Sequence, residues 1–196
     1  MKQADILTLL HQKNGMLTAA QAVSVGISLS MLQHLVNQGY LLRPARGVYT
    51  LPNVWEDDFL NLQTRFKRGV FSHETALFLW NLTDRTPVTY HMTFPATYNL
   101  SNPRKAGIRC AHVKLTRYSL GMMEVRSPAG NTVRCYSMER TLCDILRPRH
   151  AADIQIVSEA FKRYTDNRQK NIPLLSAYAN CLGVEKKVRP YLEVLL

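Results

Sequence analysis

Apolar residues in the first fifty positions recur at helical spacing in three short runs, and each run is followed by a glycine. Gly15, Gly26 and Gly39 stand where a left-handed residue would end a helix. The pattern predicts three short helices, at about residues 2–14, 19–25 and 29–38.

Two of these helices also carry starting signals. In "TAAQ", Thr18 can accept from the backbone of the first turn while Gln21 reaches back, which is a capping box. Ser28 stands just before the third run and predicts its N-cap.

The third helix has two different faces. On a helical wheel the core face carries Leu29, Leu32, Leu35 and Val36. The opposite face carries Ser30, His34, Asn37 and Gln38, with Met31 and Gln33 on its flanks. Short or planar polar side chains can pair with base edges, and carboxylates that would repel phosphates are absent from this helix. The alternative is an ordinary solvated face, but such faces are usually rich in Lys and Glu.

A short basic ribbon follows this helix. Two β-prone runs, at residues 40–43 and 48–51, are joined by turn residues, so the tip projects Arg43 and Arg46. Helices followed by a basic ribbon predict a winged helix-turn-helix, in which the third helix enters the major groove and the wing contacts the backbone. The DNA-binding candidates are Ser28, Ser30, Met31, Gln33, His34, Asn37, Arg43 and Arg46.

We place a domain boundary after residue 53, giving a winged helix-turn-helix at 1–53 and a larger α+β domain at 54–196. Trp55, Phe59, Leu62 and Phe66 predict the buried stripe of a helix ending near Gly69. The preceding acids, Glu56, Asp57 and Asp58, fit the positive end of that helix better than a metal site.

The second domain reads as strands between helices, which makes the chain an α+β protein. Ser72 is expected to cap a helix to about residue 81, and Val88, Tyr90, Met92 and Phe94 to form the buried side of a strand. Ser137 is expected to cap the helix "MERTLCDILR". Further strands are expected at 108–115, 122–126 and 132–136, and further helices at 152–164, 172–182 and 184–195.

The net charge of +11 favours a polyanionic partner. Residues 1–53 hold four cations and one carboxylate, a net charge of +3, so +8 lies in the rest of the chain. We interpret part of this excess as a candidate second DNA-contacting surface, although such clusters are often simply solvated. Its residues are Arg65, Lys67, Arg68, Arg104, Lys105, Lys162 and Arg163.

Several classes of function are disfavoured. The four cysteines form no CxxC pair, so we expect buried thiols, no metal and no disulfide framework. No signal peptide or membrane-spanning apolar run is present, which predicts a cytoplasmic protein.

An enzyme is the least favoured alternative. His73 and Glu74 would point about 100° apart on a helix, and the remaining acids form no metal-binding motif. Walker, HExxH and GxSxG motifs are absent, so no catalytic residue and no cofactor is assigned.

Four segments together resemble one family over essentially the whole chain. "RGVYTL" after the third helix, "FSHETALFLWNL", "YHMTFP" and "YSMERTLCDILR" are similar to the AbiEi antitoxins of bacterial abortive-infection systems. In the family pattern, Arg43, Arg46, Gly47 and Tyr49 correspond to the wing, and residues 137–144 to a recurrent C-terminal helix.

The resemblance implies a repressor of its own operon that also protects against phage as a type IV antitoxin. The implied toxin is nucleotidyltransferase-like and is opposed without a stable complex. Because one small winged helix covers a short half-site, we expect two copies on inverted repeats of double-stranded DNA in the protein's own promoter. A protein-interaction antitoxin with a vestigial helix-turn-helix remains the alternative.

Overall fold

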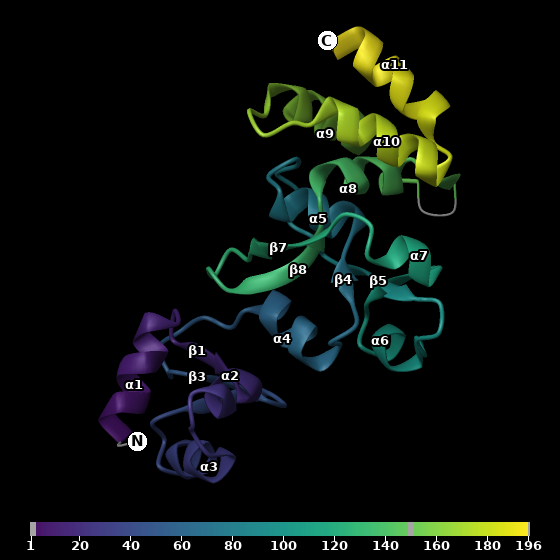
Figure 1. Ribbon diagram of the computed structural model, residues 1–196. Helices are drawn as coiled ribbons and strands as arrows, with labels where there is room; N and C mark the ends of the chain where they lie inside the picture. Colours follow the sequence, from purple (N-terminus) through teal and green to yellow (C-terminus); the bar gives the residue numbers. More distant parts are fainter. Residues whose placement is uncertain (1–2, 149–150, 196) are drawn as a thin grey trace. The chain divides into compact units, whose positions relative to one another are not determined.

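The computed structural model describes residues 3–148 and 151–195, which form two compact units (Figure 1). Unit 1 is Met1–Lys67 with Arg126–Val133, and unit 2 is Arg68–Val125 with Arg134–Leu196. The expected start of the first helix at Lys2 lies outside the described residues.

Unit 1 is built on a helix-turn-helix with a three-stranded antiparallel sheet in the order β1-β3-β2. Its core is aliphatic, with Ile6, Leu10, Leu32 and Leu35 buried between the helices. The elements are α1 (Gln3–Gln12), β1 (Met16–Thr18), α2 (Ala19–Ser24), α3 (Leu29–Asn37), β2 (Leu42–Ala45), β3 (Val48–Thr50) and α4 (Asp58–Arg65). The predicted helix-turn-helix and the hairpin behind it are confirmed, whereas β1 was not anticipated.

The helix starts in unit 1 follow local chemistry. Thr18 and Gln21 form the predicted capping box, with the Gln21 amide donating to Thr18 Oγ1 at 3.2 Å and the Thr18 amide donating to Gln21 Oε1 at 2.8 Å. Ser28 Oγ accepts from the Met31 amide at 3.2 Å. Both predicted caps are therefore confirmed.

Two apolar residues of unit 1 are not where the pattern predicts them. Trp55 is 92% exposed because α4 begins at Asp58 and Trp55 precedes its first turn. Leu29 is 49% exposed, since it is the first residue of α3 and lies beyond the reach of the core.

Asp57 links α4 to a distant part of the chain. Its Oδ1 accepts from the Leu60 amide at 3.2 Å, which makes Asp57 the N-cap of α4. Its Oδ2 accepts from Ser127 Oγ at 2.5 Å and from Asn131 Nδ2 at 2.8 Å. Asp57 is 3% exposed, so this acid serves packing and capping, and it places the tip of the β7–β8 hairpin in unit 1.

Unit 2 contains a five-stranded mixed sheet in the order β6-β5-β4-β8-β7. β4 pairs antiparallel with β5 and parallel with β8, and β5 pairs parallel with β6. The strands are β4 (Val70–Phe71), β5 (His91–Pro95), β6 (Arg109–Val113), β7 (Met122–Arg126) and β8 (Thr132–Tyr136). The helices are α5 (His73–Leu79), α6 (Ser101–Lys105), α7 (Leu115–Tyr118), α8 (Met138–Ile145), α9 (Ile154–Asp166), α10 (Ile172–Leu182) and α11 (Glu185–Leu195).

The main core of unit 2 surrounds α8. Leu142 and Ile145 of α8 pack with Phe161 of α9 and Leu175 of α10 in one buried cluster, and Figure 1 shows α9 and α10 over α8, with α11 beyond them. This arrangement of helices around a sheet confirms the predicted α+β class.

Unit 2 departs from the sequence expectations at three kinds of position. Val88 is 99% exposed because β5 begins only at His91. Thr93 of β5 is buried, and its hydroxyl is satisfied there by donating to Ser72 Oγ at 2.9 Å. Ser72 precedes α5 but makes no capping hydrogen bond with its side chain. The expectation that all cysteines are buried is wrong for Cys181, which is exposed, and Cys110 is half-buried.

Candidate nucleic-acid interface

The outer face of α3 is polar and open to solvent. Ser30, Gln33, His34 and Asn37 are exposed, and Met31 is half-buried at the edge of the core. Leu32 and Leu35 on the other side of the helix are 0% and 1% exposed. Because these two leucines face the core, the polar face opposite them points to solvent.

Polar side chains on this face hold one another in place. Gln33 Nε2 donates to Asn37 Oδ1 at 3.0 Å, across one helical turn. This pair leaves the Asn37 amide nitrogen as a donor and the Gln33 carbonyl oxygen as an acceptor. Ser28 and Ser30 hydroxyls lie 3.0 Å apart at the start of the helix. The face therefore presents partly ordered donors and acceptors, as direct readout of base edges requires.

The β2–β3 hairpin, which we call the wing, brings two arginines beside this module. Arg43 and Arg46 are exposed, and neither forms an ion pair with a carboxylate of the described residues. The Arg43 guanidinium lies 5.8 Å from the centre of the Tyr49 ring, which orients it without neutralising it. Both charges remain available to an anionic partner.

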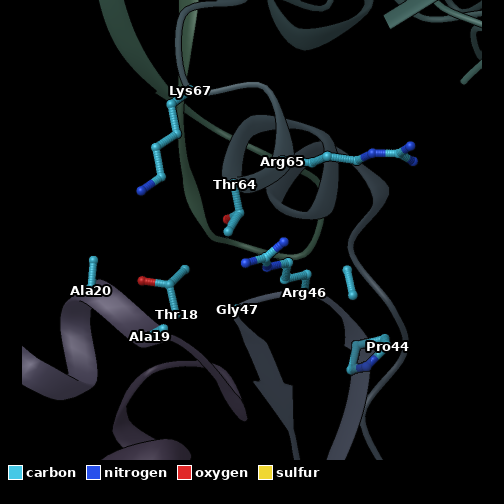
Figure 2. A pocket seen from close by; sticks show the side chains of 10 residues that line it. Thr18, Ala19, Ala20, Pro44, Arg46, Gly47, Thr64, Arg65 and Lys67 are labelled. Atoms are coloured by element: carbon cyan, nitrogen blue, oxygen red, sulfur yellow. The ribbon is translucent and has the colours of Figure 1, made fainter. Parts of the chain in front are cut away.

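A groove of about 770 Å³ runs between the wing, the start of α2 and the end of α4. The Ala19 amide donates to Gly47 O at 2.8 Å, which fastens the wing tip to α2. Gly47 has φ of 81°, and a Cβ there would lie 3.7 Å from side-chain atoms of both Ala19 and Thr64. In Figure 2, the Arg46 side chain enters this space from the wing, and the Lys67 side chain enters it from the segment that follows α4.

The candidate second basic surface is split between the two units. Arg65 and Lys67 belong to unit 1, whereas Arg68, Arg104, Lys105, Lys162 and Arg163 belong to unit 2.

The two basic residues of α9 have different surroundings. The Arg163 guanidinium binds both carboxylate oxygens of Asp84 and also lies 2.8 Å from Glu159. The hydrogen bond from Arg163 lowers the pKa of the Asp84 carboxyl. Lys162 instead lines a small apolar depression with Tyr191 and other residues of α11. The two cations thus do not form a joint patch, and Arg163 is already neutralised.

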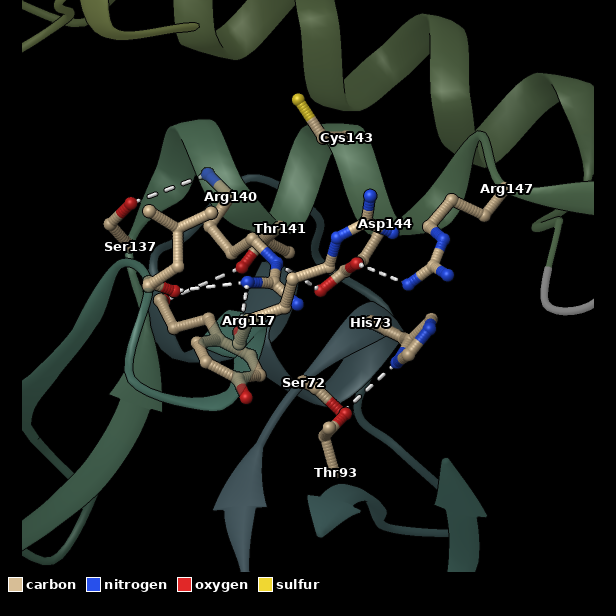
Figure 3. A network of polar contacts seen from close by, with 12 residues as sticks. Ser72, His73, Thr93, Arg117, Ser137, Arg140, Thr141, Cys143, Asp144 and Arg147 are labelled. Carbon is tan, nitrogen blue, oxygen red and sulfur yellow. Dashed lines mark hydrogen bonds and ion pairs between the residues drawn. The ribbon is translucent and has the colours of Figure 1, made fainter. Parts of the chain in front are cut away.

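Unit 2 contains a buried network of charged groups around α8 (Figure 3). Arg140 Nε donates to Asp144 Oδ2 at 2.8 Å, and Arg140 Nη1 donates to the carbonyls of Arg117 and Leu120 at 2.8 and 3.1 Å. Arg147 lies 3.5 Å from Asp144 Oδ1. Burial raises the pKa of the Asp144 carboxyl, and the Arg140 guanidinium opposes that rise.

His73 lies at the edge of this network with an unusual backbone. The φ angle of His73 is 52°, outside the helical range. His73 lines a cavity of about 240 Å³ together with Asp144 and Arg147. His73 and Glu74 also line one neighbouring cavity of about 330 Å³ with Arg109. The two adjacent residues thus border one cavity, although His73, the first residue of α5, has a φ outside the helical range.

Sequence reasoning did not single out Arg109 or Arg147 in these cavities. For Arg147 the sequence holds a weak signal, because this residue follows Asp144 at i+3. For Arg109 it holds no signal, because Arg109 reaches His91 only through the pairing of β5 with β6. In the part of the chain that the structure describes, no group of three or more His, Cys, Asp or Glu side chains could hold a metal ion. None of the described helices is sufficiently long and apolar to traverse a bilayer.

The chain thus combines a helix-turn-helix and its wing in unit 1 with a sheet-containing unit 2. Residues 4–52 match the family model described as "Transcriptional regulator, AbiEi antitoxin", which confirms the predicted resemblance for this N-terminal segment. This is a family of regulators and antitoxins and not an enzyme family.

One solved structure extends the comparison beyond the N-terminal module. The RV2827C protein from Mycobacterium tuberculosis is 13% identical, with a TM-score of 0.51 over 90% of this chain and 70% of that chain. At this identity the likeness concerns the fold alone. A search of curated proteins finds no match.

Proposed function

We propose that this protein binds double-stranded DNA through α3 and the wing and represses transcription of its own operon. The observation that carries the proposal is the exposed, carboxylate-free face of α3, followed directly in the chain by a wing whose two arginines have no carboxylate partner among the described residues. Both lie in the segment that matches the regulator family.

The side chains of α3 and those of the wing suit different parts of a DNA duplex. Ser30, Met31, His34 and Asn37 supply hydroxyl, thioether, imidazole and amide groups for base edges and thymine methyl groups. Arg43 and Arg46 neutralise phosphates, which positions the helix but carries no sequence information. A module of this size covers a short half-site, so two chains on an inverted repeat complete the operator.

We further propose that the protein is the antitoxin of a type IV system in abortive phage infection. It would act in the cytoplasm and oppose a nucleotidyltransferase-like toxin without a stable complex. The support is the family match of the N-terminal module, while unit 2 supplies a separate folded body with most of the positive charge.

The antitoxin role has its own test. Growth is measured when the full chain, or a DNA-binding variant such as Asn37→Ala with Arg46→Ala, is expressed with the toxin encoded beside it. Rescue of growth by both proteins, without co-purification of the toxin, is the expected result. Loss of rescue, or a stable complex, contradicts the type IV assignment.

A footprint on the DNA upstream of its own gene tests the repressor role. Protection of two half-sites related by inversion, lost at high salt, is expected. An absence of salt-dependent binding to any duplex would instead favour an antitoxin that acts through protein contacts, and metal-dependent turnover of nucleotides or RNA would favour an enzyme.

A further inference from the structure

A groove of unit 1 lies between the start of α2, the wing and the end of α4, and residues of α3 are not among those that line it. Ten residues line it, and they are Thr18, Ala19, Ala20, Pro44, Ala45, Arg46, Gly47, Thr64, Arg65 and Lys67. Four of these residues are alanine or glycine, so a bulky ligand can approach their backbone closely. Hydroxyl groups of Thr18 and Thr64 add hydrogen-bonding capacity at its walls.

The charge of the groove has one sign. Its lining contains three cations and no carboxylate, and the cations are exposed without an ion pair to any described carboxylate. In Figure 2 the Arg46 and Lys67 side chains reach into the open space, whereas the Arg65 guanidinium turns away. Arg65 lies 5.0 Å from the centre of the Phe66 ring. Arg46 and Lys67 are therefore the two charges directed at a ligand.

The lining also restricts the kind of anion. No aromatic side chain is among the residues that line the groove, so it offers no platform on which unpaired bases could stack. A duplex presents its phosphates outward and needs only cations, hydroxyl groups and backbone donors. The groove is continuous with the wing through Arg46, so a duplex held by the wing would extend along it.

We propose that this groove holds the sugar-phosphate backbone of the DNA duplex and that the end of α4, with Lys67 just after it, is part of the DNA-binding surface. The inference rests on the proposed DNA binding and extends it from the winged module to the helix that follows. α4 is positioned for this role because it contacts β2 and because Asp57 anchors its first turn.

The principal test is the salt dependence of binding by the full chain, for an operator duplex and a scrambled duplex of equal length. Lys67→Ala should make the slope of log affinity against log salt shallower by about one, because one phosphate contact is lost. The change should be the same for both duplexes. Lys186→Ala is the matched control, since Lys186 is an exposed lysine of unit 2, and its slope should equal that of the parent.

A pair of substitutions at Ala20 tests the groove itself. Ala20 is exposed at the first turn of α2, where an acid is compatible with the helix dipole, so Ala20→Glu should fold normally. It should weaken binding to both duplexes by about tenfold, because it adds a negative charge among the phosphates. Ala20→Gln has nearly the same shape and should bind like the parent.

Three results overturn the proposal in distinguishable ways. If the parent binds duplex DNA but Lys67→Ala and Ala20→Glu keep its slope and affinity, the groove is not in contact with DNA and the wing and α3 suffice. Lower stability of Lys67→Ala with an unchanged salt slope would show that Lys67 stabilises the segment after α4 and does not contact DNA. If the parent binds neither duplex, the proposed function fails together with the inference.

Discussion

Helices α3 and α8 are similar in length and both are rich in polar residues, but they use those residues in opposite ways. α3 buries Leu32 and Leu35 and leaves its polar side exposed, whereas all eight residues of α8 are buried, including Glu139, Arg140 and Asp144. Polarity alone therefore does not identify a recognition surface. What distinguishes the two helices is whether the polar groups already have partners inside the protein.

The polar groups of α8 are largely satisfied by the protein itself. Arg140 binds Asp144 and two backbone carbonyls, and Tyr164 Oη donates to Glu139 Oε1 at 3.1 Å. On α3, by contrast, the hydrogen bonds join neighbours on the same exposed face. We interpret α8 as a structural element of unit 2 and α3 as the element that meets a partner.

Among the variants that distinguish α8 from α3, Arg140→Met should have the largest effect, and this effect is on stability. The variant leaves the Asp144 carboxylate buried and facing only Arg147 at 3.5 Å, so the free energy of unfolding should fall by about 3–5 kcal/mol. Urea denaturation followed by circular dichroism measures the loss.

The matched variant is Arg140→Met with Asp144→Leu, which removes both charges. It should recover much of the lost stability, because no unpaired carboxylate then remains buried. A loss below about 1 kcal/mol for Arg140→Met alone would show that water reaches Asp144 and that the network is not a structural core.

A smaller and opposite pattern is expected on α3. Ser30→Ala, His34→Ala and Asn37→Ala should each change the free energy of unfolding by less than about 0.5 kcal/mol, because the side chains are exposed. Each residue that pairs with a base should lose about 1–3 kcal/mol of discrimination between operator and scrambled DNA. Competition binding measures the discrimination.

Gln12→Ala offers a control on α1, where Gln12 is also exposed. It should leave both stability and discrimination unchanged. If the three α3 variants discriminate as well as the parent does, another surface reads the DNA and the comparison with α8 loses its functional meaning.

Features that depend on a few neighbouring residues were predictable from the sequence. The capping box at Thr18 and Gln21 and the cap at Ser28 were expected, because each involves groups three residues apart. Strands β7 and β8 and helix α10 also fall where the periodicity placed them. The exposed face of α3 followed from the same local pattern.

Features that depend on distant residues were not predictable. Asp57 was expected at a helix start, but its burial requires Ser127 and Asn131, more than sixty residues away. The groove requires the wing to meet the end of α4, and no periodicity signals that contact. In the same way, "MERTLCDILR" indicated a capped helix but not that Arg140 would be buried with Asp144 and would donate to the carbonyls of Arg117 and Leu120.

The wing should show a still smaller effect, one that does not depend on sequence. Arg43→Ala and Arg46→Ala should weaken binding to operator and scrambled duplexes alike, and each should reduce the salt slope by about one. Specificity should survive, because arginines that hold phosphates do not read bases. Unchanged affinity for both duplexes would remove the wing from the interface.

The smallest expected effect is on the rate at which cysteine thiols react with a disulfide reagent. This rate reports how well α8 is shielded from solvent and does not involve DNA affinity. Cys143 of α8 is buried, and burial raises the pKa of its thiol to about 12, so at neutral pH it holds almost no thiolate for a disulfide reagent to attack. Cys181 of α10 is exposed and should react at once, and Cys181→Ser should abolish this fast phase. Cys143 should react only as the protein unfolds, and faster in Arg140→Met, because loss of the Arg140–Asp144 pair loosens α8. Equal rates of Cys143 labelling in the parent and in Arg140→Met would show that the burial of α8 does not depend on the Arg140–Asp144 ion pair. Apolar packing alone would then keep α8 buried.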